Sequence, residues 1–207
     1  MMGSRLTTDL KKALQCFKKG MRAQSSKQKI ADEGWLTDNY FFLEQACAAA
    51  LAESVRSKPD ADALYDKCRQ VCKSGVLPSQ RELIENFENS GVYYADKLSL
   101  ALRASLLVYA GEGVKIKGIE GKELLSNSVR SLRRLEEFDF EYITGAILSC
   151  EKLLQSDPAG IYGLLDDFSK SEYRKLVMTK AEASGKSEAE AAEEALINAR
   201  KSGKHIG

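Results

Sequence analysis

Apolar side chains recur at three- and four-residue steps through most of this chain, and that spacing restricts it to a helical fold. The strongest example covers residues 34–57, where the apolar side chains fall on one stripe: Leu36, Tyr40, Leu43, Cys47, Ala50 and Leu51. Side chains spaced in this way lie on one face of an α-helix and need a partner that covers them. Alternating patterns typical of strands are nearly absent. The sequence therefore predicts an all-α fold, an irregular array or bundle of several helices.

Glycine, proline and capping residues set the expected helix boundaries. We expect helices over the ranges 4–23, 34–57, 61–73, 79–89, 92–110, 122–136, 139–155, 170–184 and 188–202. The helix over 92–110 is apolar on most of its surface, so it should be central. Four glycines between residues 111 and 121 predict a loop, and residues 114–117 alternate in a way that would also suit a short strand.

The chain is expected to end in a helical hairpin over residues 169–203. A Ser-x-x-Glu capping box opens at Ser169 and another at Ser187. Between them, Gly185 is placed to end the first helix in the left-handed conformation that glycine adopts without strain. Earlier, Asp157 is placed to cap a short helix or turn that starts at Pro158.

Length and composition fit one helical domain over residues 1–207. The chain is 43% hydrophobic and 29% charged, which suffices for a core. Its 31 basic and 30 acidic residues do not indicate a nucleic-acid partner. Residues 1–30, however, hold eight basic side chains against one acid, Asp9. They could form an N-terminal arm that touches an anionic membrane or polyanion, although a solvated helix face is the simpler interpretation.

Localisation and thiol chemistry are expected to be those of a cytoplasmic protein. The apolar run over 106–110 falls short of the ~20 residues that span a membrane, and the N-terminus lacks the apolar centre of a signal peptide. Any position at the inner face of the membrane would then depend on a partner. The five cysteines are odd in number and favour free thiols. Cys68 and Cys72 share a helical face, but no further metal ligand lies near them in the sequence.

No catalytic, cofactor or metal site is predicted from the polar residues. His205 is the only histidine, and no nucleophile accompanies it in its polar tail. Asp60 and Asp62 form an Asp-x-Asp pair without the preceding strand that a metal-dependent transferase would supply, and Asp60 is better read as a helix cap. The adjacent acids at 166–167 and 193–194 point about 100° apart on a helix, so neither pair forms facing carboxylates. Whether the protein is an enzyme stays open at this level.

Three aromatic residues are candidates for interaction with a partner or for stacking on sugar rings. They are Trp35, Tyr40 and Tyr162. Trp35 is the only indole in the chain and follows a glycine. Packing in the core is the simpler interpretation of all three rings.

Five groups of short segments along the chain follow one another in the same order as similar segments in a known protein family. They are Trp35–Tyr40 with Leu43–Gln45, Ser128–Leu135 with Phe138–Phe140, Asp157–Tyr162, Tyr173-Arg174 with Ser184–Glu190, and His205–Gly207. In this order they resemble the helical region near the N-terminus of bacterial cyclic β-1,2-glucan synthases. The resemblance implies a part of an inner-membrane glycosyltransferase that builds β-1,2-glucans from UDP-glucose. None of the family's transferase motifs is present, so no catalytic residue is carried over.

The resemblance implies a non-catalytic scaffold or docking region. Its expected partner is a transferase or membrane module in the same or a neighbouring polypeptide, with no cofactor and no nucleic acid. One alternative is a free-standing helical adaptor or regulator that binds another protein through a groove. Another is an independent sugar-active enzyme, which the lack of converging polar groups disfavours.

Overall fold

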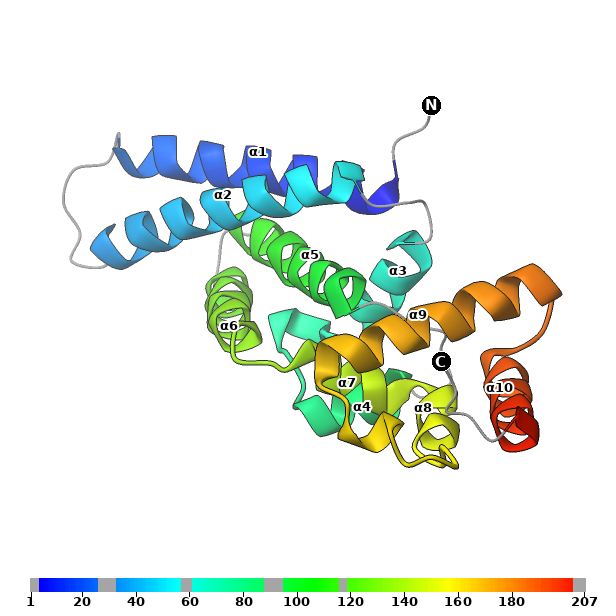
Figure 1. Cartoon of the computed structure of the whole chain (residues 1–207). Coiled ribbons are helices and arrows are strands. Elements are labelled where there is room, and N and C mark those ends of the chain that lie inside the picture. Colours follow the sequence, from blue (N-terminus) through cyan, green and yellow to red (C-terminus); the bar gives the residue numbers. More distant parts are fainter. Residues whose placement is uncertain (1–3, 26–32, 57–60, 88–94, 116–118, 203–207) are drawn as a thin grey trace. The chain divides into compact units, whose positions relative to one another are not determined.

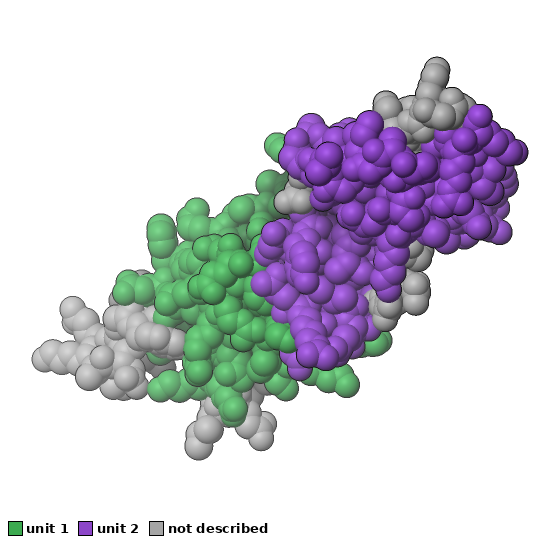
Figure 2. Space-filling view, turned by 60° about the horizontal axis from the view of Figure 1, so that its bottom comes forward, with its two compact units in different colours: residues 1–79, 96–138 green, residues 80–95, 139–207 purple. Residues whose placement is uncertain are grey.

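A computed structural model describes residues 4–25, 33–56, 61–87, 95–115 and 119–202 of the chain. Within these ranges the chain forms ten α-helices and two short 3-10 helices without a strand, so the predicted all-α fold is confirmed (Figure 1). The chain divides into two compact units: unit 1 comprises residues 1–79 and 96–138, and unit 2 comprises residues 80–95 and 139–207 (Figure 2). The single domain over 1–207 stays a prediction.

Unit 1 is built on a long antiparallel pair of helices. Its elements are α1 (Arg5–Ser25), α2 (Glu33–Arg56), α3 (Ala61–Val71), the 3-10 helix η1 (Lys73–Gly75), α5 (Ala95–Lys115) and α6 (Ile119–Leu135). α1 and α2 run side by side in opposite directions, and α5 lies next to them (Figure 1). The apolar stripe of α1 is buried at Leu6, Leu10, Ala13 and Phe17. Most of the N-terminal segment that could have formed an arm is therefore a packed helix.

The loop predicted over residues 111–121 is wrong. α5 continues to Lys115 and α6 begins at Ile119, so Val114 and Lys115 are helical and not part of a strand. The remaining residues of that stretch, 116–118, lie outside the described ranges. Glycine lowers helix propensity, which is why the sequence pattern favoured a loop. Tertiary packing overrides that preference here.

The glycines of α5 serve close contacts between helices. A Cβ atom added to Gly111 would lie 3.0 Å from the Cα atom of Ala13 in α1. A Cβ atom on Gly113 would lie 2.7 Å from the carbonyl oxygen of Gly121 in α6. The second distance is shorter than real Cβ contacts and the first is at their lower limit, so the missing side chains let α5 approach α1 and α6. Consistent with this, α5 is buried along most of its length, as expected of a central helix.

Unit 2 has shorter helices and a smaller apolar core. Its elements are α4 (Gln80–Phe87), α7 (Phe140–Ile147), α8 (Ser149–Leu154), the 3-10 helix η2 (Tyr162–Leu164), α9 (Asp167–Ser184) and α10 (Glu188–Ser202). A core cluster of mostly small and aliphatic side chains joins the last four helices: Leu148, Cys150, Leu154, Tyr162, Val177, Ala181, Ala191 and Ala192.

The single helix predicted over 139–155 is interrupted at Leu148. That residue is extended, with φ −73° and ψ 124°, and it separates α7 from α8. Its side chain is buried in the core cluster. The spacing of the apolar residues over 139–155 predicts one inward-facing stripe that includes Tyr142, Ile143 and Ile147. Within α7, Ile143 and Ile147 are buried, whereas Tyr142 is 61% exposed. The spacing of apolar residues does not predict a break of one extended residue between two helices.

The predicted helical hairpin is present as α9 and α10. Gly185 ends α9 with φ 66°, and the backbone N–H of Lys186 donates to the carbonyl of Ala181 at 3.0 Å. The second capping box is formed, because the backbone N–H of Ser187 donates to Glu190 at 2.8 Å and the Ser187 hydroxyl accepts from the N–H of Glu190 at 3.3 Å. The hydrogen bond from the backbone N–H of Ser187 lowers the pKa of the Glu190 carboxyl.

The first capping box is not the start of α9. The helix begins at Asp167, three residues before the start at residue 170 that the box predicts. Asp166 is the cap, and its carboxylate accepts the backbone N–H of Ser169 at 2.7 Å. That hydrogen bond lowers the pKa of Asp166. Aspartate and serine are both good caps, so local preference did not separate them.

Candidate functional site

The Asp157 motif of unit 2 folds as a turn. Of the two expected outcomes, helix start or turn, the second is observed. The Asp157 carboxylate accepts three backbone N–H groups, from Ala159 at 3.3 Å, Ile161 at 3.0 Å and Tyr162 at 3.1 Å. The carboxylate is buried beneath the loop that it closes. Its role is to position the backbone that leads into Tyr162.

Tyr162 connects this turn to the interior of unit 2. Its ring is fully buried and packs edge-to-face against Tyr173 of α9, with centroids 5.8 Å apart. Its hydroxyl donates to Glu151 of α8 at 2.8 Å. Burial, and next the Glu151 carboxylate, raise the pKa of the Tyr162 phenol, so the group stays a protonated donor.

Arg174 completes a polar cluster around the same carboxylate. The guanidinium is 7% exposed and donates to Glu151 of α8 and to Glu141 of α7, each at 3.2 Å. It also lies over Gly145, where an added Cβ atom would sit 3.5 Å from the guanidinium Nη1. One buried cation therefore ties α7, α8 and α9 together. Because both carboxylates are held by the same arginine, the arrangement is that of a structural clamp.

A second cluster in unit 1 holds the segment after η1 against α6. The hydroxyl of Ser131 accepts the backbone N–H of Leu77 at 2.9 Å. Arg134 donates to the carbonyls of Leu77 at 2.7 Å and Pro78 at 2.8 Å. The Ser-Val-Arg-Ser-Leu-Arg-Arg-Leu stretch thus uses successive turns of α6 to fix an extended backbone. Extended backbone without a strand partner needs such side-chain bonds.

Ser128 of α6 lies where α6 comes close to the backbone of η1. The side chain is fully buried, and its hydroxyl oxygen lacks a hydrogen-bond partner within the described residues. It faces Gly75, where a Cβ atom would collide with the hydroxyl oxygen. Gly75 has φ 73°, and the preceding Ser74 is also left-handed, with φ 58°. Only glycine satisfies both the conformation and the space at position 75.

Two of the resembling segments also meet in unit 1. Arg133 of α6 donates to the side chain of Asn39 in α2 at 3.4 Å, and its guanidinium lies 5.7 Å from the ring centroid of Phe42. The Trp-Leu-Thr-Asp-Asn-Tyr segment and the α6 segment are therefore in direct contact. In unit 2, the Asp157–Tyr162 segment likewise meets the Tyr173-Arg174 pair.

The three predicted aromatic candidates do not form one site. Trp35 lies in α2, but its side chain is outside the described part, so its role stays a prediction. Tyr40 is buried in unit 1, close enough to Gly20 that an added Cβ atom would lie 3.1 Å from the ring. Tyr162 is buried in unit 2. Neither tyrosine offers a ring face to solvent, and both pack in the core.

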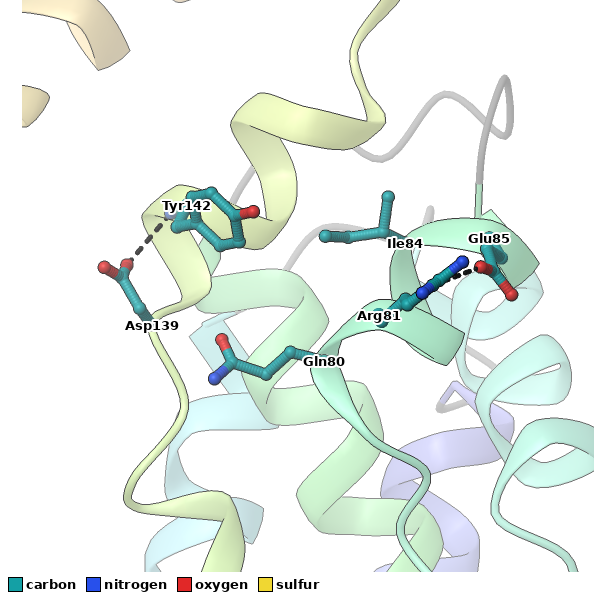
Figure 3. A pocket seen from close by; sticks show the side chains of 6 residues that line it. All are labelled: Gln80, Arg81, Ile84, Glu85, Asp139 and Tyr142. Carbon is teal, nitrogen blue, oxygen red and sulfur yellow. Dashed lines mark hydrogen bonds and ion pairs between the residues drawn. The ribbon is translucent and has the colours of Figure 1, made fainter.

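A shallow pocket of about 560 Å³ lies between α4 and α7 in unit 2. Its lining residues are Gln80, Arg81, Ile84, Glu85, Asp139 and Tyr142 (Figure 3). Tyr142 and Ile84 supply its apolar part from the two helices. Arg81 pairs with Glu85 at 2.9 Å, and Asp139 caps α7 through the N–H of Tyr142. Sequence reasoning missed this pocket because it placed Tyr142 in the core.

A smaller pocket of about 180 Å³ in unit 1 is lined by paired charges. Arg69 bonds Glu112 at 2.9 Å and lies 4.5 Å from the ring centroid of Tyr109. Burial lowers the pKa of Arg69, but the interactions with Glu112 and Tyr65 together outweigh burial, and the pKa is raised. Asp9 accepts from the hydroxyl of Tyr65 at 3.2 Å. These acids are engaged by neighbours and do not face one another across a cleft.

The remaining polar candidates are explained by packing or lie outside the described ranges. Asp62 of the Asp-x-Asp pair caps α1, accepting the backbone N–H groups of Arg5 at 2.9 Å and Leu6 at 3.1 Å. Asp60 and His205 are outside the described residues. Across the part of the chain that the structure describes, His, Cys, Asp and Glu side chains do not gather into a group that could hold a metal ion.

All five cysteines are free thiols, and four are buried. Burial raises the pKa of Cys47, Cys72 and Cys150 to about 12 and that of Cys68 well above its ordinary value. A thiol must ionise to act as a nucleophile or a metal ligand. These four thiols are therefore protonated core residues at neutral pH.

Large apolar side chains are exposed in η2 and along α9. Leu164 is 87% exposed, Phe168 is 75% exposed and Leu176 is 66% exposed. Leu176 recurs with Tyr173 and Val177 at helical spacing, which predicts that Leu176 lies on the inner face of the hairpin, and this prediction is wrong. The sequence did not indicate that Leu164 and Phe168 would be exposed, since single apolar residues near a helix start are common in cores.

Comparison of the chain with protein-family models, with curated proteins and with solved structures gave no match. Among the helices that the structure describes, none is both long enough and apolar enough to cross a lipid bilayer.

Proposed function

We propose that this chain is a non-catalytic helical docking region that binds another protein module through unit 2. The observation that carries the proposal is the exposure of Leu164, Phe168 and Leu176 within one short stretch. Phe168 and Leu176 are eight residues apart in α9, so they project within about 80° of each other. Single exposed apolar residues are ordinary, but several together are typical of a surface that a partner covers.

The arrangement of the acids supports a non-catalytic role. Glu141 and Glu151 are both bonded to Arg174, and Glu112 is bonded to Arg69. General acid–base catalysis needs a carboxyl or imidazole that can exchange a proton with a bound substrate. Carboxylates that neutralise a buried arginine are poor candidates, since protonating them would leave the cation uncompensated.

The partner that we propose is a glycosyltransferase or membrane module of a cyclic β-1,2-glucan synthase, in the same or a neighbouring polypeptide. The support is the order of the resembling segments together with their contacts. Asn39 meets Arg133, and Tyr162 meets Tyr173, so segments far apart in the sequence are paired in space. Segments that pack against one another in one fold are expected to be found together in the sequences of a protein family with that fold. On this proposal the chain acts at the cytoplasmic face of the membrane through its partner.

The test is the affinity of the full chain for a purified glucan synthase transferase module, measured by titration calorimetry. Phe168→Asp should weaken binding more than about tenfold, because it places a charge in the centre of the buried surface. Val55→Asp is the matched control, since Val55 is equally exposed but lies on α2 in unit 1. Equal affinities for the two variants would exclude the α9 surface.

Absence of catalysis is tested separately. The chain is incubated with UDP-glucose or with β-1,2-glucan, and products are followed by chromatography. We expect no turnover above the buffer blank. Reproducible turnover that persists through purification would overturn the non-catalytic assignment.

A free-standing adaptor is the second candidate, and the pocket between α4 and α7 favours it. An open groove with Ile84 and Tyr142 inside and the charged pair Arg81–Glu85 at its edge suits an amphipathic helix of another protein. A partner that docks there would lose affinity with Tyr142→Asp and keep it with Phe168→Asp. The opposite pattern would favour the α9 surface.

A further inference from the structure

The solvent-facing side of α1 is rich in basic residues. The helix buries its apolar stripe, and its exposed side chains include six cations: Arg5, Lys11, Lys12, Lys18, Lys19 and Arg22. At 100° per residue these six positions fall within an arc of about 140°. The only acid in the helix is Asp9. The eight basic residues noted near the N-terminus therefore include a single cationic helix face.

Four of these cations have no counter-ion in the described part of unit 1. Arg5 pairs with Asp66 at 2.9 Å, and Lys12 lies 3.6 Å from Asp9. Lys11, Lys18, Lys19 and Arg22 make no ion pair with any residue that the structure describes. Among the residues that the structure describes, the positive charge of the second half of α1 is therefore not neutralised by ion pairs. The whole chain has a net charge of only +1, so this is a local asymmetry.

Helix stability does not explain the pattern. The helix dipole favours a cation in the last turn, which accounts for Arg22 but not for Lys11. Lys18 and Arg22 are four residues apart, a spacing at which like charges repel and weaken a helix. A face that served only solubility would mix both signs. The repeated basic residues therefore indicate an anionic partner.

We propose that the basic face of α1 docks this chain on an anionic phospholipid surface. Lysine supplies most of the charge, and lysine is depleted at protein–protein interfaces. Single-stranded nucleic acids are held by stacking on aromatic side chains, which this face lacks. Clustered lysines matched to lipid phosphates are instead typical of peripheral membrane attachment.

The packing of α1 defines how it attaches. Phe17 and Leu10 are fully buried, so the apolar side of the helix is not free to enter the acyl region. Attachment is then electrostatic, and the helix lies on the headgroups without insertion. Such binding weakens steeply with salt. The inference is independent of the docking surface on unit 2, because it concerns another helix and another kind of partner.

The experiment is co-sedimentation of the full chain with vesicles at low and high salt. Vesicles of equal parts phosphatidylglycerol and phosphatidylcholine should bind the chain, vesicles of phosphatidylcholine alone should not, and salt should release it. The variant in which Lys11, Lys18, Lys19 and Arg22 are changed to Gln should bind at least about 50-fold more weakly, since each cation near an anionic surface contributes about fivefold. Glutamine is a good helix former, so circular dichroism should be unchanged.

A matched control removes the same number of charges from unit 2. Lys152, Lys180, Arg200 and Lys201 are exposed and are changed to Gln together. This variant should bind within about threefold of the unmodified chain, because it keeps the basic face intact. An equal loss in both variants would mean that binding follows net charge, and the inference would be wrong.

Two further outcomes would overturn the lipid assignment. One is a failure to bind the phosphatidylglycerol vesicles at low salt. The other is displacement from the vesicles by duplex DNA or by poly-glutamate at matched anionic charge, with tighter binding to that competitor and the same dependence on the four cations. Vesicle binding that resists both competitors would support the lipid surface.

Discussion

Unit 1 and unit 2 are stabilised by different means. Unit 1 brings long helices into close contact, using Gly111 and Gly113 to remove the side chains that would hold them apart. Unit 2 has shorter helices and a core of small residues, and it places a buried arginine, Arg174, between three of them. The comparison shows that where helices are short and apolar area is limited, charged and capping groups define the geometry.

The two strategies carry different vulnerabilities. Backbone-to-backbone contacts as in unit 1 cannot accommodate an extra methyl group, because a main chain does not rotate out of the way. A buried ion pair as in unit 2 fails when one partner is removed, because the other charge is left uncompensated. The following predictions test this contrast, and hydrogen exchange resolved by segment reports the two units separately.

The largest expected effect is an alkaline loss of stability that is greater in unit 1. Unit 1 buries Cys47, Cys68 and Cys72, whereas unit 2 buries only Cys150 among the described residues. A pKa raised in the folded state means that the unfolded chain loses its proton first, so stability is complete below about pH 9 and falls as pH rises toward 12. At about pH 10.5, each thiol with a pKa near 12 lowers the free energy of unfolding by about 2 kcal/mol.

Unit 1 should therefore lose at least about 4 kcal/mol from Cys47 and Cys72, and unit 2 about 2 kcal/mol from Cys150. Urea unfolding and hydrogen exchange at neutral and alkaline pH measure both. Replacing the buried thiols by alanine should flatten the pH dependence. Equal losses of unfolding free energy in the two units would contradict the assignment of the alkaline effect to the buried thiols.

Phe17→Ala should lower the free energy of unfolding of unit 1 by about 4 kcal/mol. Phe17 is fully buried on the apolar stripe of α1, so truncation leaves a cavity in the core of unit 1. Urea denaturation gives the magnitude. Phe41→Ala, at an exposed position on α2, should change stability little. A loss below about 1 kcal/mol at Phe17 would mean that the α1–α2 contact contributes little to unit 1.

Arg174→Met should lower the free energy of unfolding of unit 2 by about 3 kcal/mol. The substitution keeps much of the volume but leaves Glu151, which is mostly buried, without its cation. Hydrogen exchange should increase in α7, α8 and α9 together. Adding Glu151→Gln to Arg174→Met should recover part of the loss, because the uncompensated charge is removed. If the double variant is no more stable than the single one, the clamp interpretation fails.

Gly113→Ala should destabilise unit 1 by about 2 kcal/mol, although alanine is the better helix former. The new Cβ atom would lie 2.7 Å from a backbone carbonyl oxygen of α6, which cannot move without shifting the helix. Gly163→Ala is the control, because its nearest neighbour would be the end of the Gln155 side chain at 3.6 Å. A shift in the thermal midpoint for Gly163→Ala as large as that for Gly113→Ala would refute the close-contact explanation.

The smallest expected effect is a gain. Ser128→Ala removes a buried hydroxyl that lacks a partner in the described part of the chain, and it should stabilise unit 1 by up to about 1 kcal/mol. Ser131→Ala, one helical turn later, should cost about 1 kcal/mol, because Ser131 accepts the N–H of Leu77. Thermal unfolding of the two variants side by side measures the difference. Shifts of the same sign would argue against the hydrogen-bond assignments in this cluster.

Local signals predicted the hairpin of α9 and α10 well. Gly185, Ser187 and Glu190 act through backbone conformation and hydrogen bonds within a few residues, so their effect can be read from neighbours in the sequence. The stripes of α1 and α2 were also visible, because a helix that packs on one side must repeat its apolar residues. The basic side of α1 follows from the same periodicity once its buried side is known.

The sites that could bind partners were much less accessible to sequence reasoning. Tyr142 lines a pocket because α4, which is distant in the sequence, lies beside α7. Likewise, Tyr40 and Tyr162 are unavailable to a ligand because other helices cover them. Exposure is a property of what lies opposite a residue, and the residue's own neighbours in the chain do not report it.

By itself, the amino-acid order determined that this protein is helical, where most helices begin and end, and that its charge gathers near one end, since propensity, capping and periodicity act over a few residues. The tertiary structure alone decided that the glycines of α5 permit contact, that Arg174 joins three helices, and which apolar side chains stay exposed. Those outcomes depend on atoms brought together from distant parts of the chain. Their energies exist only once the backbone has placed them within a few ångströms of one another.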